Sequence, residues 1–270
     1  MNTTNSGHDP GESDGSDRRA VKSVVAAFDV IEKLRVLDGT TVSELSKHVD
    51  RSIGTVHTHL ATLKAQGYVV QEDNVYRLSP RFVALGEYVR NSSKLYQGAK
   101  DEADRLAEET GEVVHLLTEQ DGLKIGIYEA FGGEAVGTEY FVRNQGKPKR
   151  FLHYSAAGKA ILAYLPRERV EDIVARHGLI EKTPNTITDE AELFEELETV
   201  RDRGFALNDE EQVMGLRAVG APIRDVSGAV LGAISLAAPK SRLKDDEFRE
   251  TVPERVMNSA NIININIQTQ

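Results

Sequence analysis

The sequence has no cysteine among its 270 residues. This absence excludes disulfide bonds, thiolate metal sites and a thiol nucleophile, and it favours a reducing compartment. No apolar run approaches the roughly 18 residues that a membrane-spanning helix needs, and the N-terminus lacks the basic-then-apolar order of a secretory signal. We therefore expect a soluble, cytoplasmic protein that makes no contact with a membrane.

The chain also lacks an overall positive charge, which would favour a nucleic-acid partner. Its formal net charge is -10, but the charge is unevenly distributed. Residues 1–17 carry -4, residues 96–270 carry -10, and residues 18–95 carry 12 Lys or Arg against 8 Asp or Glu, an excess of +4. Only the segment 18–95 is cationic, and its excess is modest for binding phosphates. The acidic remainder suits a salt-adapted organism.

The N-terminal third of the sequence shows the pattern of a DNA-binding domain. Residues 1–17 are rich in Gly, Ser, Asp and Asn and are predicted to form a disordered acidic tail. A helix that buries one stripe is predicted over 20–37 by the helical spacing of apolar Val21, Val24, Val25, Phe28, Ile31, Leu34 and Leu37. The segment 41–78 then reads as a short helix, a turn, a second amphipathic helix and a two-stranded ribbon. This order is typical of a winged helix-turn-helix, which we assign to residues 18–80.

The second helix of this motif is the predicted recognition helix. Ser52 is a plausible N-cap, and Ile53, Val56 and Leu60 are predicted to form its apolar face. The opposite face carries short polar groups and a glycine that are able to approach DNA. With the arginines of the ribbon, the candidate DNA-binding residues are Arg51, Ser52, Gly54, Thr55, His57, Thr58, His59, Thr62, Arg77 and Arg81.

The remainder of the chain predicts a helical linker over 81–110 and a second domain over 111–270. Strands and helices are mixed there without a regular strand-helix repeat, which favours an α+β domain over a doubly wound one. Strands are predicted at 112–119, 123–131, 139–143, 205–207, 215–224 and 229–237, and helices at 155–165, 167–177, 189–203 and from about 245. Thr188 is the predicted cap of the helix 189–203.

Several segments together resemble the IclR family of transcriptional regulators. The first are TVSELSKHVD and GTVHTHLATLKAQGYV, and the later ones are LHYSAAGKAILAYLP, TITDEAELFEELETVRDRGFALNDEEQVMGLRAVGAPIRD and GAVLGAISLAAPKSRL. The resemblance implies a winged helix-turn-helix, a linker helix and a GAF-like mixed α/β domain that binds a small organic effector. It also implies homodimers joined through the DNA-binding domains, often paired into tetramers, on a roughly palindromic operator in double-stranded DNA.

The resemblance also implies an effector site. Carried over position by position, it comprises backbone amides of Ala156 and Ala157 together with Asn208, Leu216, Ala218, Ser235 and Ala237. Asn208, Ala218 and Ala237 replace the acidic, cysteine and second serine positions of the best-understood pocket, so we expect a different, less polar ligand. Ile53 and Thr58 replace basic residues of the family's recognition helix, so the operator sequence cannot be inferred from that of a relative.

Some polar residues leave alternatives open. Ser235 is a pocket wall or a packed hydroxyl, and Arg217 pairs with an anionic effector or with Glu210. The acidic run 209–211 is interpreted as a solvated surface. The histidines His57 and His59 point about 200° apart on a helix, which argues against a shared metal.

The sequence therefore predicts a DNA-binding transcriptional regulator controlled by a small organic effector, an organic acid or related catabolic metabolite. No catalytic triad, metal-ligand set or cofactor loop is recognisable, so we assign no catalytic residue, metal or cofactor. The alternative is an enzyme that acts on a small carboxylate and uses the helix-turn-helix for assembly or regulation.

Overall fold

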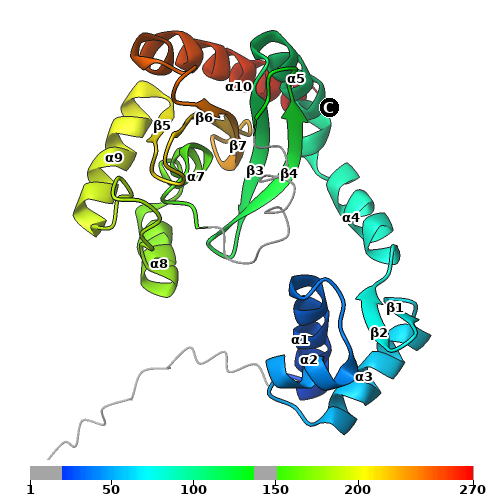
Figure 1. Ribbon diagram of the computed structural model, residues 1–270. Helices are drawn as coiled ribbons and strands as arrows, with labels where there is room; N and C mark the ends of the chain where they lie inside the picture. The colour runs from blue at the N-terminus through cyan, green and yellow to red at the C-terminus, as the bar shows by residue number, and fades with distance from the viewer. Residues whose placement is uncertain (1–19, 137–150, 270) are drawn as a thin grey trace, which may run out of the picture. The chain divides into compact units, whose positions relative to one another are not determined.

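The computed structural model describes residues 20–136 and 151–269. The chain divides into two compact units, Met1–Phe82 and Val83–Gln270 (Figure 1). The acidic tail predicted for 1–17 and the strand predicted for 139–143 lie outside the described residues. The two units are described separately below.

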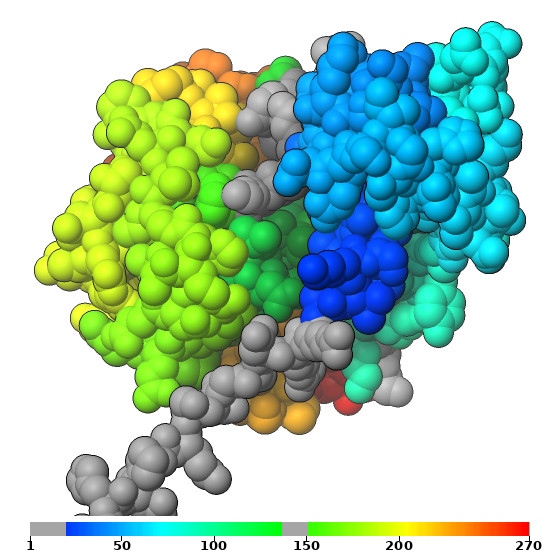
Figure 2. Space-filling model, turned by 90° about the horizontal axis from the view of Figure 1, so that it is seen from below, coloured from blue at the N-terminus to red at the C-terminus, as the bar shows by residue number. Residues whose placement is uncertain are grey.

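The first unit contains three helices and a hairpin in its described part, and Figure 2 shows its surface in blue to cyan. The elements are α1 (Lys22–Val36), α2 (Val42–His48), α3 (Ile53–Ala65), β1 (Val69–Glu72) and β2 (Val75–Leu78). The two strands pair in antiparallel fashion, with Glu72 opposite Val75 across the turn. A backbone bridge between Thr40 and Tyr76 ties the hairpin to the start of α2. The predicted winged helix-turn-helix is confirmed.

One face of each helix forms the core of this unit. Val30 and Leu34 of α1 pack with Leu45 of α2 and with Val56 and Leu60 of α3. All of these side chains are at most 1% exposed. Replacing one of the leucines by Ala would lower the free energy of unfolding by about 2–5 kcal/mol.

Two details of the predicted apolar faces are wrong. Val21, which precedes α1, and Val24, Val25 and Phe28 of α1 were expected in the buried stripe, yet they are 44–63% exposed. The buried stripe is narrower, because residues at i, i+4 spacing, namely Ala26, Val30 and Leu34, already fill the interface. Ile53 was expected beside Val56, yet it is 57% exposed. As the first residue of α3 it lies beyond the edge of the core.

The second unit is built on one antiparallel sheet. Its strands are β3 (Val113–Gln120), β4 (Leu123–Phe131), β5 (Ala206–Asp209), β6 (Leu216–Arg224) and β7 (Val230–Pro239), in the order β4-β3-β7-β6-β5. Its helices are α5 (Lys94–Thr110), α7 (Ala156–Leu162), α8 (Arg167–His177), α9 (Glu190–Arg203), η1 (Glu247–Thr251) and α10 (Val252–Gln268). Since every strand pair is antiparallel, the prediction of an α+β domain is confirmed.

The sheet carries a separate core on each face. Helices α5 and α10 cover one face (Figure 1), where Leu116, Ile234 and Phe248 are fully buried. Helices α7 and α9 cover the other face, where Ala206 and Ala233 meet Ala160 and Leu193. The alternation of strand residues therefore sends one set of side chains to each layer of helices.

The segment 81–110 contains two helices with different environments. Helix α4 (Arg81–Asn91) buries none of its residues and exposes Val83, Leu85, Tyr88 and Val89. Helix α5 instead buries Ala99, Ala103 and Leu106 in the core of the second unit and ends at Gly111 in the left-handed conformation. The cap of α9 is Asp189, whose carboxylate accepts from Glu192 N, and not Thr188.

Candidate functional site

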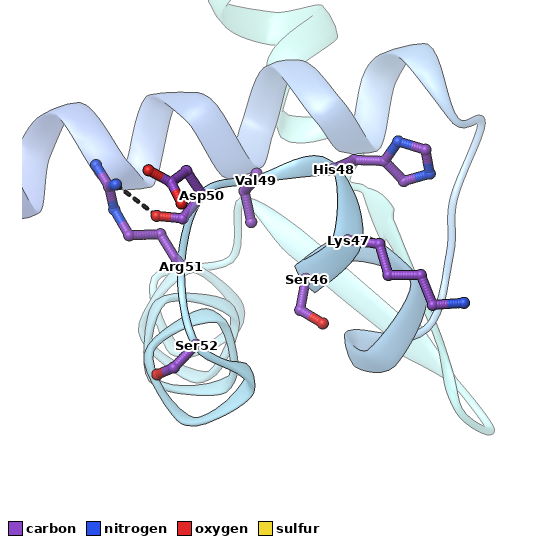
Figure 3. A pocket seen from close by; sticks show the side chains of 7 residues that line it. All are labelled: Ser46, Lys47, His48, Val49, Asp50, Arg51 and Ser52. Atoms are coloured by element: carbon purple, nitrogen blue, oxygen red, sulfur yellow. Dashed lines mark hydrogen bonds between the residues drawn. The ribbon is translucent and has the colours of Figure 1, made fainter.

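The turn between α2 and α3 borders an open groove. Thr41 caps α2 by accepting from Glu44 N at 3.3 Å, so the helix begins where the sequence predicts. Seven residues, Ser46, Lys47, His48, Val49, Asp50, Arg51 and Ser52, line a groove of about 650 Å³ (Figure 3). Figure 3 shows Arg51 and Ser52 leading into α3, with the Arg51 guanidinium bonded to the Asp50 carbonyl at 2.7 Å.

Five of these groove residues were not among the predicted DNA contacts, and three of the five belong to α2. Ser46, Lys47 and His48 form the last turn of α2, and their polar groups line the same groove as Arg51. Lys47 and His48 both contact the Glu44 carboxylate, at 2.7 and 3.3 Å, and the hydrogen bond from Lys47 lowers the pKa of Glu44. A basic last turn of α2 beside the predicted recognition helix is visible in the sequence, but only the turn geometry shows that it lines the groove.

The hydroxyl groups of α3 are already engaged within the helix. Ser52 caps the helix by accepting from Thr55 N at 3.2 Å, and its oxygen lies 2.9 Å from the Thr55 hydroxyl. Thr58 donates to the Gly54 carbonyl at 3.0 Å, and Thr62 donates to the Thr58 carbonyl at 2.9 Å. All four side chains stay exposed, as does His57, whereas His59 is half-buried.

The two arginines proposed for phosphate contact differ in their surroundings. Arg77 on β2 is paired with Glu72 at 3.5 Å, and both side chains are well exposed. Arg81 donates to the Gln66 carbonyl at 2.7 Å and lies over the Tyr68 ring at 4.8 Å. Arg81 therefore ties the end of α3 to the start of α4, whereas the Arg77 charge faces solvent.

In the second unit, the strand residues of the effector site implied by the family resemblance lie on one face of the sheet. Asn208 pairs with Ala218, and Ala218 pairs with Ala237, so these three residues form a row across β5, β6 and β7. Ser235 lies two residues before Ala237 and therefore shares its face. This is the face that α7 covers, because a Cβ added to Gly220, opposite Ser235, would lie 2.6 Å from the Ala156 backbone.

Two buried polar residues on this face were missed as site residues. His115 is the cross-strand neighbour of Ser235, and Glu129 is the cross-strand neighbour of His115. His115 Nδ1 lies 3.3 Å from the Glu129 carboxylate, and the two side chains are only 8% and 4% exposed. The sequence spacing hides this pair, because a β-hairpin brings the two residues together.

Asn208 is fixed by the loops around it. Its amide donates to the Tyr154 carbonyl at 2.7 Å, and its oxygen accepts from Glu211 N at 3.1 Å. Ser235 is 4% exposed on the α7 side of the sheet, so it faces the layer that holds Ala156 and Ala157. Asn208 thus holds the strand β5 and the segment before α7 at a fixed separation.

A buried lysine connects α7 to its neighbours. Lys159 is 2% exposed, and its ammonium lies 2.6 Å from Glu211 and 3.4 Å from Glu196 of α9. Burial raises the pKa of the Glu211 carboxyl despite the attraction of Lys159. The interpretation of residues 209–211 as a solvated surface is wrong, since Glu210 and Glu211 are each 7% exposed.

Arg217 pairs with carboxylates other than Glu210. It makes two hydrogen bonds to the Asp209 carboxylate, at 2.7 and 3.1 Å, and an ion pair with Asp245 at 2.8 Å. Glu210 pairs with Lys240 instead. The Arg217 guanidinium also lies 4.6 Å from the centre of the Phe248 ring, so it belongs to the core on the α10 side. Of the two alternatives left open by the sequence, pairing with Glu210 is therefore wrong.

Neither a metal site nor a membrane span is found in the part of the chain that the structure describes. No group of three or more His, Cys, Asp or Glu side chains in 20–136 and 151–269 is placed to hold a metal ion. Over the same residues, none of the helices combines the length and apolarity needed to cross a bilayer.

Comparison with known proteins decides the family. The family model described as "IclR helix-turn-helix domain" matches residues 23–73, and "Bacterial transcriptional regulator IclR C-terminal" matches residues 88–265. The chain belongs to the IclR family of transcriptional regulators. It is 42% identical over 262 residues to the probable HTH-type transcriptional regulator ArcR of Halobacterium salinarum, covering 97% of this chain and 99% of ArcR. The source of this IclR relative agrees with the expectation of a salt-adapted organism.

Other relatives and solved structures of the IclR family agree with this assignment. The regulator BhcR of Paracoccus denitrificans is 31% identical, with 85% of this chain and 81% of BhcR covered. The IclR regulator of Alicyclobacillus acidocaldarius has a TM-score of 0.76 at 24% identity, covering 92% of this chain and 99% of that chain. An IclR homologue from Microbacterium hydrocarbonoxydans, solved with 4-hydroxybenzoate, has a TM-score of 0.71 at 21% identity, covering 90% and 100%.

These findings settle the class of protein. The chain is a DNA-binding transcriptional regulator with an effector-binding domain. The enzyme alternative receives no support, since the family and the named relatives are transcriptional regulators.

Proposed function

We propose that two copies of this regulator bind a roughly palindromic operator and that a small organic effector changes this binding. The observation that carries the proposal is the uncovered apolar face of α1. Val21, Val24 and Phe28 are 63%, 50% and 62% exposed on a helix that already supplies the core with its other face. A cluster of large exposed apolar side chains marks an interaction surface, and a second copy of α1 offers the same apolar chemistry.

A two-fold axis at α1 would make each copy read one half of the DNA site. In dimeric helix-turn-helix proteins the two recognition helices enter successive major grooves about 34 Å apart, and the operator shares the symmetry of the protein. The proposed contact residues on the reading side are those around the start and outer face of α3. They are Arg51, Ser52, Gly54, Thr55, His57, Thr58, His59 and Thr62, with Arg77 and Arg81 toward the phosphates.

The proposed effector site lies on the α7 face of the sheet. Its residues are Ala156, Ala157, Asn208, Leu216, Ala218, Ser235 and Ala237, to which we add His115 and Glu129. The support is their common face and their chemistry, since a few buried polar groups stand among alanines. Such a lining suits a small organic acid or related metabolite with an apolar body. The Microbacterium homologue, which holds 4-hydroxybenzoate, supports this class of ligand.

The effector would act by shifting a population of dimer geometries. A ligand can favour one spacing of the two reading helices only if it binds that state more tightly. Helix α4 is the proposed connecting element, because it buries none of its own residues and exposes Val83, Tyr88 and Val89 at 65%, 73% and 66%.

Sedimentation and DNA selection test the proposal. The wild-type chain is expected to sediment as a dimer or dimer of dimers and to enrich a near-palindromic site from random duplexes. Phe28→Asp should reduce the dimer while the chain keeps its native circular dichroism spectrum, and it should weaken operator binding about 100-fold, because two linked half-sites bind far more tightly than one. A Phe28→Asp protein that stays fully dimeric would remove α1 from the interface. Val226→Asp, at a residue that is 80% exposed in the second unit, is the matched control.

A thermal-shift panel of small carboxylates tests the effector site. A ligand that binds the native state raises the melting temperature. Ser235→Ala should abolish a shift found with the wild-type chain, while Val226→Ala should keep it. An unchanged shift in Ser235→Ala would place the ligand elsewhere.

A further inference from the structure

We propose that α3 recognises thymine through Ile53, so that each half of the operator contains an A·T pair whose thymine methyl group contacts this side chain. The inference rests on the proposed DNA binding and names what the recognition helix reads. Ile53 was expected in the core, yet it is 57% exposed at the first position of α3.

The position of Ile53 directs it toward base edges. In an α-helix every Cα–Cβ bond tilts toward the N-terminus, so the side chain of the first residue leads the helix. In helix-turn-helix proteins the N-terminal residues of the recognition helix are the ones that contact bases in the major groove. An isoleucine offers no hydrogen bond, and the thymine C5-methyl is the apolar group that the major groove displays.

The hydroxyls of α3 are poorly placed to donate to bases. The hydroxyls of Thr58 and Thr62 donate hydrogen bonds to the backbone carbonyls four residues earlier, at 3.0 and 2.9 Å. Ser52 and Thr55 share a hydrogen bond at 2.9 Å. What the threonines still present is a methyl group and an oxygen lone pair. An adenine N6 amino group can donate to such a lone pair while its paired thymine supplies the methyl, so the A·T pair is matched on both counts.

The charged residues of α3 argue against a guanine reader. The usual specific contact to guanine is a bidentate Arg or Lys. The segment 53–65 contains no Arg, and its one lysine, Lys64, donates to Gln71 at 2.9 Å near the far end of the helix. Arg51, before the helix, is bonded to the Asp50 carbonyl.

The backbone beside Ile53 permits close approach. A Cβ built on Gly54 would meet nothing within 4 Å, so the space next to Ile53 is open. A thymine methyl can therefore reach Ile53 without displacing a neighbouring side chain of α3.

Replacing thymine by deoxyuridine tests the proposal, because this change removes only the methyl group. The full-length chain first selects its site from random duplexes, and each thymine of that site is then replaced in turn. With the wild-type chain, one position in each half-site should bind about fourfold more weakly, which corresponds to about 0.8 kcal/mol for one buried methyl. With Ile53→Ala, the thymine-to-deoxyuridine ratio at that position should fall to about one, because the partner of the methyl is gone.

Controls separate this contact from folding and from general affinity. Ile53→Ala should melt at the wild-type temperature, since the side chain lies outside the core, and Val226→Ala should keep the wild-type thymine-to-deoxyuridine ratio.

Three outcomes would contradict either the proposed operator binding or the proposed thymine contact. No enriched sequence at all would overturn the proposed operator binding. An enriched site whose half-sites contain only G·C pairs would overturn the thymine contact and leave operator binding standing. The same conclusion would follow if Ile53→Ala kept the wild-type thymine-to-deoxyuridine ratio.

Discussion

Charged residues are used in different ways in the two units. In the described ion pairs of the first unit, the carboxylate side chains are 47–78% exposed, as in the pair of Arg77 with Glu72. In the second unit, the side chains of Lys159 and Glu211 are 2% and 9% exposed, and Arg217 is 6% exposed. Exposed pairs contribute little to stability, whereas breaking one partner of a buried pair is costly. The pairs of the first unit can therefore exchange a carboxylate for a phosphate, whereas these buried pairs of the second unit cannot.

The largest expected effect is on the buried lysine of α7. Lys159→Met should lower the free energy of unfolding by about 3–5 kcal/mol, because it leaves the Glu211 carboxylate buried without its cation. Denaturant unfolding at neutral pH measures the loss. Lys159→Met combined with Glu211→Leu should recover most of it, since the uncompensated charge is then removed.

The matched control is an exposed pair of the same unit. Arg167 and Glu171 on α8 lie 2.9 Å apart with side chains 64% and 47% exposed. Arg167→Met should change the free energy of unfolding by at most about 0.5 kcal/mol. Equal losses for Lys159→Met and Arg167→Met would break the distinction between buried and exposed charges.

Two serine caps offer the same comparison without charge. Ser155 caps α7 and is 5% exposed, whereas Ser52 caps α3 and is exposed. Both replacements by Ala should destabilise within the usual range of about 0.5–2 kcal/mol. Ser155→Ala should lie at the upper end, because water cannot reach the Gly158 amide that it leaves. A larger loss from Ser52→Ala would contradict this order.

A buried histidine gives the second unit a dependence on pH. His153 is 3% exposed, and burial lowers the pKa of its imidazole below the ordinary 6.5, against a hydrogen bond to the Ile180 carbonyl. The unfolded chain then binds this proton more readily than the folded one. Stability should therefore fall as pH drops below about 6.5, by at most about 1.4 kcal/mol per pH unit.

His153→Gln isolates this contribution, because the amide can still donate to the Ile180 carbonyl. Its unfolding free energy should change less between pH 7 and pH 5 than that of the wild-type chain. An identical pH profile for the two proteins would assign the dependence to other groups.

Replacement of Arg77 should have the smallest effect on stability and a clear effect on DNA binding. Arg77→Ala should change the free energy of unfolding by less than about 0.5 kcal/mol, since its pair with Glu72 is exposed. Loss of the Arg77 charge should make the plot of log binding constant against log salt concentration less steep, by about one unit per protomer. Arg167→Ala, equally exposed in the second unit, should leave that slope unchanged. A slope that Arg77→Ala does not alter would remove Arg77 from the phosphate contacts.

Local features were predicted well in both units. The cap at Ser52 and the end of the helical linker at residue 110 each depend on residues a few positions apart. The polar pairs of the second unit were not predicted. His115 and Glu129 are neighbours only because a hairpin pairs their strands, and Lys159 lies 52 residues before Glu211. Spacing along the chain carries no information on such contacts.

The order of elements, the winged helix-turn-helix and the family could be predicted from the sequence, because periodicity, capping and motifs involve neighbouring residues. Which residues of an apolar or charged pattern are buried became visible only in the folded structure. The structure placed Ile53 outside the core and Glu211 in the interior, and it paired Arg217 with Asp209 and Asp245. The physical reason is that burial depends on what packs from distant elements, and a helix end or strand end can extend beyond that cover.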